Sequence, residues 1–160
     1  DVVSFSTGVL EDSFHIAGAI EVELQVASTA PDTAFTAKLV EVFADGRMIN
    51  IRDGITSLGY DRGLPVASPY KPGSRTQTTI RLWPIDWRMS PGSRLRLDIS
   101  SSDFPKYHFH RNRAGPWAAQ DGADVALQTV HGGRLILAMK ARDKKRGSSE
   151  PLLKNRRVSQ

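Results

Sequence analysis

Apolar and polar residues alternate along several short stretches of this chain, and a period of two residues predicts β-strands. The clearest stretches are residues 20–26 and 94–99. The side chains that this pattern places inward are those of Ile20, Val22, Leu24, Val26, Leu95, Leu97 and Ile99. Residues 35–43 are apolar on both alternating faces, which predicts a central strand rather than an edge strand.

Glycine and proline positions predict where the strands end. Asp45-Gly46 predicts a two-residue type I′ turn that leads into a partner strand over residues 48–52. Asp53-Gly54 and Gly132-Gly133 predict further turns, and Trp83-Pro84 predicts the end of a strand because proline cannot donate to a ladder. The remaining strands are expected over residues 2–5, 55–60, 75–82, 125–130 and 134–138.

This pattern gives about nine short strands and no helical period. Residues 61–74 and 100–124 are expected to be loops, because proline and glycine interrupt them. The predicted fold is all-β, an antiparallel β-sandwich of jelly-roll type.

Length and composition narrow the class of protein. The 160 residues suit one domain with a real core. The chain has no cysteine, which excludes disulfides and thiolate metal sites. It has no signal-peptide pattern and no apolar run of about 20 residues, the length of a membrane span. We therefore expect no membrane association. Localisation stays open, with the cytoplasm slightly favoured.

The net charge of +5 comes from the end of the chain. Residues 1–139 carry 14 Lys/Arg and 15 Asp/Glu, whereas residues 140–160 carry eight Lys/Arg and two Asp/Glu. We therefore predict a neutral domain over residues 1–139 and a basic, disordered tail over residues 140–160. Such a tail can bind nucleic acid, but the preferred interpretation is a solvated terminus. Nucleic acid is not expected as a partner.

Motifs for catalysis or cofactor binding are absent from the sequence. It has no Gly-x-Ser-x-Gly, no phosphate loop and no dinucleotide fingerprint, so no cofactor is expected. His108 and His110 would point the same way in an extended segment, as a metal site requires. Without a third ligand nearby, however, they are interpreted as loop histidines.

Tryptophans offer an alternative function. Trp83, Trp87 and Trp117 could form a platform on which sugars stack, which would make the chain a stand-alone carbohydrate-binding module. Packing in the core or at an interface is the preferred interpretation for these side chains.

Several ordered motifs resemble the C-terminal domain of the X-Pro dipeptidyl-peptidase and cocaine esterase (CocE/NonD) family of serine hydrolases. They are Ala30-Pro31-Asp32-Thr33, residues 35–40, Asp45-Gly46-Arg47, Asn50 with Asp53-Gly54-Ile55, residues 100–107, Arg111-Asn112 and residues 134–137. The resemblance covers residues 1–139. It departs from the family pattern at residues 107–112, in the loop 113–124 and in the tail.

The resemblance implies a galactose-binding-like jelly roll that follows an α/β-hydrolase domain bearing a Ser-Asp-His triad. In such an arrangement this domain covers part of the catalytic cleft and makes contacts with other domains and subunits. The resemblance therefore implies the catalytic domain as partner, and it also implies a homo-oligomer. The parent would be an acyl esterase or an X-Pro dipeptidyl-peptidase. No residue of this chain matches a catalytic residue, so enzyme activity of the chain itself stays undecided.

The loop 102–112 is expected to face the catalytic domain, because aromatic residues beside charges are typical of interfaces. The candidate interface residues are Asp103, Phe104, Tyr107, Phe109 and Asn112. The resemblance also begins inside the family's domain, so one edge of the sandwich is expected to lack its covering segment.

Overall fold

A computed structural model describes residues 1–60 and 68–140 of the chain. In these ranges it contains seven β-strands and one short 3₁₀ turn at Trp117–Ala119. The strands are β1 (Val2–Ser6), β2 (His15–Ser28), β3 (Ala34–Val42), β4 (Met48–Ser57), β5 (Thr76–Arg88), β6 (Arg94–Ser100) and β7 (Gln128–Met139). None of the described helical segments is long and apolar enough to cross a membrane.

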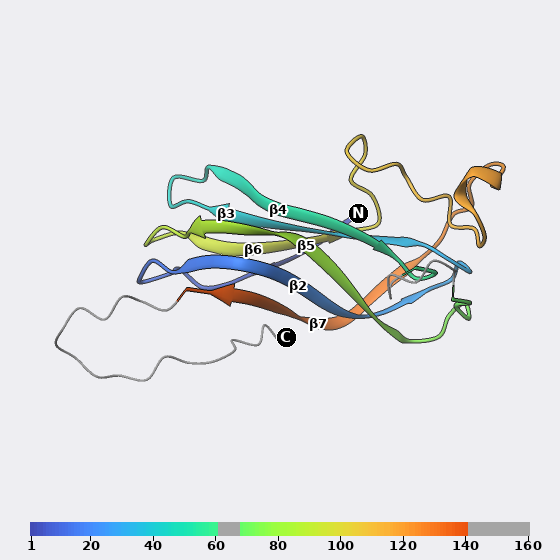
Figure 1. Cartoon of the computed structure of the whole chain (residues 1–160), viewed down its shortest axis with the longest axis horizontal. Coiled ribbons are helices and arrows are strands. Elements are labelled where there is room, and N and C mark those ends of the chain that lie inside the picture. The colour runs from blue at the N-terminus through green and yellow to red at the C-terminus, as the bar shows by residue number, and fades with distance from the viewer. Residues whose placement is uncertain (61–67, 141–160) are drawn as a thin grey trace.

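The strands form two antiparallel sheets that face each other (Figure 1). One sheet has the order β1-β6-β3-β4 and the other has the order β5-β2-β7. The predicted all-β antiparallel sandwich is therefore confirmed. β1 and β4 are the edge strands of the first sheet, and Val2 and Val3 of β1 are exposed.

Alternating side chains from both sheets fill the core between them. All seven inward positions predicted on residues 20–26 and 94–99 are buried. β3 lies between β6 and β4 and is buried on both faces, as predicted. Its inner face carries Phe35 and Leu39. Its outer face carries Thr36 and Lys38, which bond to Ser100 and Asp103, so the segment after β6 covers it.

The predicted break at Asp53-Gly54 is wrong, because β4 continues through both residues to Ser57. Gly54 lies opposite Ala37 of β3. A Cβ added to Gly54 would lie 2.8 Å from the backbone oxygen of Arg81 in β5. This glycine therefore allows the two sheets to approach closely rather than the chain to turn.

The predicted strand end at Trp83-Pro84 is also wrong, since β5 runs on to Arg88. β5 is an edge strand, and its register with β2 shifts between Gly18 and Ile20. Pro84 lies at this irregularity, where a missing N–H donor costs no ladder bond.

The predicted hairpin at Gly132-Gly133 is a bulge inside the single strand β7. The register with β2 shifts between Gln25 and Val26, and Gly132 has a φ of 146°. A Cβ at Gly133 would lie 2.3 Å from the backbone oxygen of Glu23. β4 and β7 each join two predicted strands, which explains why the structure contains fewer strands than predicted.

The turn between β3 and β4 differs in type from the prediction. The Gly46 amide donates to Phe43 O over 3.0 Å, and the Phe43 amide donates to Arg47 O over 2.9 Å. Of the loop residues 44–46, only Gly46 has positive φ. This is a three-residue loop with glycine in the left-handed position, rather than a two-residue type I′ turn.

Candidate functional site

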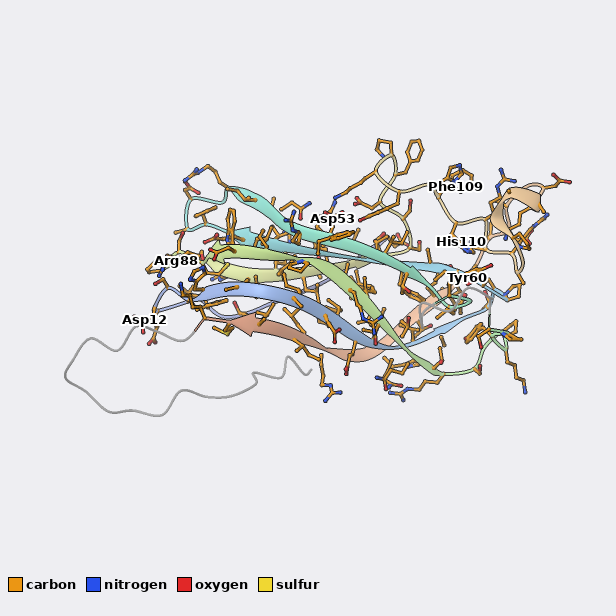
Figure 2. All side chains as sticks on the ribbon, viewed as in Figure 1. Asp12, Asp53, Tyr60, Arg88, Phe109 and His110 are labelled. Atoms are coloured by element: carbon orange, nitrogen blue, oxygen red, sulfur yellow. The ribbon has the colours of Figure 1, made fainter. Side chains whose placement is uncertain are left out.

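The loop 102–112 lies over the outer face of β3 and β4 and extends to the end of the sandwich that carries the β2–β3 turn (Figure 1). Figure 2 shows Asp53 under this region and Phe109 and His110 at the end of the molecule. The loop contains no strand or helix. Its position is therefore set by side-chain contacts, which fall into two groups.

The first group consists of two ion pairs that fix the first half of the loop to the sheet. Lys38 Nζ of β3 lies 2.9 Å from Asp103 Oδ1, and Lys106 Nζ lies 2.6 Å from Asp53 Oδ1 of β4. The Asp53 side chain is almost completely buried. Burial alone would raise its pKa, but the hydrogen bond and the charge of Lys106 hold the pKa of Asp53 below its usual value.

The same contacts change the other two ionisable groups of this half of the loop. The hydrogen bond to Asp53 raises the pKa of Lys106. Burial, with the negative charge of Asp53, raises the pKa of the Tyr107 phenol. Lys106 Nζ also lies 5.6 Å from the centre of the Tyr107 ring. Asp53 therefore stays ionised, Lys106 stays protonated and Tyr107 stays neutral near pH 7. The positive charge of Lys106 is thus balanced by the negative charge of Asp53 beside it.

The second group fixes the end of the loop to the turn at residues 31–33. His110 Nε2 lies 3.4 Å from Asp32 Oδ2, and Thr33 Oγ1 donates to Asn112 Oδ1 over 2.7 Å. Asp32 is buried, and its Oδ1 accepts the amides of Thr33 and Gly59, each over 2.8 Å.

Asn112 is a junction between three segments. Its amide donates to His110 Nδ1 over 3.0 Å, and its Nδ2 donates to Asp124 O over 2.8 Å. It has a φ of 61°, the left-handed region that asparagine tolerates better than most residues. Gln128 Nε2 joins the same cluster by donating to Thr33 Oγ1 over 2.7 Å. Asn112 thus connects the turn 31–33, the loop 102–112 and the loop 113–124.

The five candidate interface residues divide into two kinds. Phe104 and Phe109 are exposed, with 69% and 43% of their surface accessible. Asp103, Tyr107 and Asn112 are partly buried and hold the loop in place. Sequence reasoning did not assign the residues that anchor them, which are Asp32, Thr33, Lys38, Asp53, Lys106, His110 and Gln128.

A signal for most of these anchors was present in the sequence. Asp32 and Thr33, Lys38, and Asp53 belong to separate motifs of the resemblance. The loop residues Asp103, Lys106 and Asn112 that they contact also belong to its motifs, whereas His110 does not. The structure brings these motifs together. They form the support of one loop.

The two loop histidines have different neighbours, which does not suit a shared metal ion. The His108 ring stacks on Phe109 with centroids 4.9 Å apart, whereas His110 pairs with Asp32. In the described parts of the chain, no group of three or more His, Cys, Asp or Glu side chains could hold a metal.

Trp83 and Trp87 do not form one platform. Trp87 is held by its Nε1, which donates to Glu41 Oε2 over 2.8 Å. Glu41 is buried, and burial alone would raise its pKa, but hydrogen bonds led by the Ser90 amide hold that pKa below its usual value. Trp83 is 77% exposed on β5, whereas Trp87 packs against the core. Packing in the core is therefore confirmed for Trp87, and packing of Trp83 at an interface stays a prediction.

Beside the loop lies an open cleft of about 310 Å³. The ends of β3 and β4 form one side of it through Ala34, Ile55 and Thr56, and Phe109 forms the other side with its two neighbouring histidines. A second cavity, between the sheets near Phe5 and Leu135, has a volume of only about 30 Å³. The predicted tail lies almost entirely in residues 141–160, outside the described residues.

Comparisons with known proteins agree with this fold. A family model described as the X-Pro dipeptidyl-peptidase C-terminal non-catalytic domain matches residues 1–134. The cocaine esterase of Rhodococcus sp. (strain MB1 Bresler) is 36% identical over 135 residues, which are 83% of this chain and 24% of that protein.

Two solved structures share the fold. An alpha-amino acid ester hydrolase superposes with a TM-score of 0.79 at 24% identity, over 88% of this chain and 26% of that one. An aminopeptidase from a marine sediment archaeon (Thaumarchaeota archaeon) has a TM-score of 0.80 at 20% identity, with the same coverage. The chain thus spans about a quarter of the length of the relatives that it matches. None of these matches supports a stand-alone carbohydrate-binding module.

Proposed function

This chain belongs to the family of X-Pro dipeptidyl-peptidase C-terminal non-catalytic domains, and from that premise we propose that it completes the active-site cleft of a parent serine hydrolase. The parent would carry an α/β-hydrolase domain and cleave esters or X-Pro dipeptides by acyl transfer through a serine. The chain itself supplies no catalytic group. Its role is to dock on the catalytic domain and to contribute to contacts between subunits.

One observation carries this proposal. The loop 102–112 has no regular structure, yet two ion pairs and a buried hydrogen-bond cluster fix it while Phe104 and Phe109 stay exposed. Fixing a loop costs conformational entropy. A loop that is already ordered loses less conformational entropy when it binds a partner, so fixing it in advance favours docking. Exposed aromatic side chains on such a support are typical anchors of interfaces.

The proposal is tested by Phe104→Ala in the full-length parent hydrolase. If the loop docks on the catalytic domain, this substitution makes the C-terminal domain unfold separately in calorimetry and lowers kcat/KM. Trp83→Ala is the matched control, because it also removes an exposed aromatic ring but from β5. If both variants unfold as the unmodified parent does and keep its activity, the loop does not face the catalytic domain.

A further inference from the structure

The open cleft beside Phe109 has mainly apolar sides. We propose that it receives a large apolar side chain from the catalytic domain of the parent hydrolase, so that β4 takes part in the interface together with the loop. This inference rests on the proposed function and adds to it the place where the two domains interlock. Its residues on β4, Ile55 and Thr56, were not among those predicted from the sequence.

The size of the cleft suits this occupant. Its volume of about 310 Å³ lies at the lower limit of small-molecule sites, which measure roughly 300–1,000 Å³. Its sides are formed mainly by carbon atoms of Ala34, Ile55 and Phe109. Pockets of this kind at interfaces hold the few side chains that contribute most of the binding energy.

The Phe109 side of the cleft is ordered without a partner. The His108 ring stacks on the Phe109 ring at 27°, and His108 Nδ1 lies 2.9 Å from Phe109 O. On its other side, His110 is held by buried Asp32 and by the Asn112 amide. Because these contacts fix the wall in advance, docking loses little side-chain entropy there.

The charges near the cleft favour an apolar occupant over an anionic one. Lys38 is paired with Asp103 and Lys106 with Asp53, so both nearby lysines are neutralised within the domain. A membrane surface or a nucleic acid would need lysines whose charge is not already compensated. The core of a protein interface, in contrast, is depleted of charge.

The relatives offer an occupant for such a cleft, because they are much longer than this chain. The chain matches about a quarter of the length of its relatives, so about three quarters of such a polypeptide lies outside the matched part. A further exposed aromatic side chain belongs to Tyr60, whose amide donates to O of the lining residue Ser57. Figure 2 shows Tyr60 and Phe109 at the same end of the molecule.

Thiol labelling in the full-length parent tests this inference, because this domain has no cysteine of its own. Ser57→Cys places one thiol in the cleft, because Ser57 pairs with Ala34 and both residues line it. Thr79→Cys on β5 places a matched thiol on the other sheet. Both positions are strand residues of intermediate exposure. Phe104→Cys reports separately whether the catalytic domain covers the loop 102–112. Labelling by a maleimide is followed by mass spectrometry of the modified peptides.

We expect Ser57→Cys to react at least tenfold more slowly than Thr79→Cys in the native parent, and both to react equally after denaturation. Equal native rates at both positions, with Phe104→Cys protected, would overturn the cleft inference and leave the proposed function standing. Equal rates at all three positions would overturn both. If Ser57→Cys does not fold, Ile55→Cys probes the same cleft.

Discussion

Lys106 Nζ lies 2.6 Å from Asp53 Oδ1. This ion pair joins the irregular loop 102–112 to the outer face of β4, about 50 residues earlier in the chain. Asp53 is almost completely buried, whereas Lys106 remains more than half exposed. The second carboxylate oxygen of Asp53 has no hydrogen-bond partner among the described residues. Lys106 is therefore the main compensation for a buried negative charge.

Replacing Lys106 by methionine is predicted to destabilise the chain by about 1–2 kcal/mol. Removing one partner of a fully buried pair costs roughly 3–5 kcal/mol, and the exposure of Lys106 reduces that figure. Chemical unfolding measures the change. Arg81→Met is the control, because it breaks the exposed pair with Glu21 and should alter the unfolding free energy by no more than about 0.5 kcal/mol. Equal effects of the two substitutions would contradict a special role for Asp53.

The contribution of the Asp53–Lys106 pair is predicted to depend on pH at the acidic end. Because the pKa of Asp53 is lowered in the folded chain, its stabilising effect is complete above the unfolded pKa, about 4. The effect is lost as the pH falls through the folded pKa. Unfolding curves of the unmodified chain and of Lys106→Met should therefore differ at pH 7 and converge below about pH 4. A difference that stays constant between pH 7 and pH 3 would contradict this origin.

Asp32 is predicted to be more important for stability than its position in a turn suggests. Its Oδ1 accepts two amide hydrogen bonds, from Thr33 and Gly59, and a buried amide left without an acceptor costs about 1–3 kcal/mol. Asp32→Ala should thus cost about 2–4 kcal/mol in unfolding free energy. Asp32→Asn keeps an acceptor oxygen at this position and should cost less. If the asparagine variant is as unstable as the alanine variant, the charge of Asp32 rather than its amide contacts stabilises the turn.

Gly133 is predicted to tolerate no side chain. The Cβ of alanine would lie 2.3 Å from Glu23 O, so β7 would have to move away from β2. We expect Gly133→Ala to lower stability by roughly 1–3 kcal/mol, the usual cost of overpacking. At Gly8 an added Cβ meets nothing within 4 Å, so Gly8→Ala serves as the control and should unfold within about 0.5 kcal/mol of the unmodified chain. A harmless Gly133→Ala would show that the two strands separate easily at the bulge.

The fold was largely predictable because residues such as Val22 and Leu97 follow the two-residue period of a half-buried strand. The three false breaks share one physical cause. Gly54, Pro84 and Gly133 are residues that interrupt strands, yet each lies where the sandwich needs a close approach or a bulge. The close approach or the bulge at each position depends on the neighbouring strand, so it cannot be predicted from the local sequence.

The candidate site was predictable only in part. The exposed positions of Phe104 and Phe109 agree with the predicted loop surface, and whether that surface meets a catalytic domain stays a prediction. The supporting pairs, such as Lys38 with Asp103, join residues about 65 positions apart. No spacing rule links such residues. They became recognisable only as members of motifs that occur together.

The account as a whole is tested most directly by the intact mass of the native gene product after reaction with a fluorophosphonate probe for active serines. If the chain is the C-terminal domain of a serine hydrolase, the probe labels a polypeptide about three to four times as long as these 160 residues, with this sequence at its C-terminal end. A native product of about 17.6 kDa that carries no label would contradict the account, because the chain would then act without a hydrolase domain.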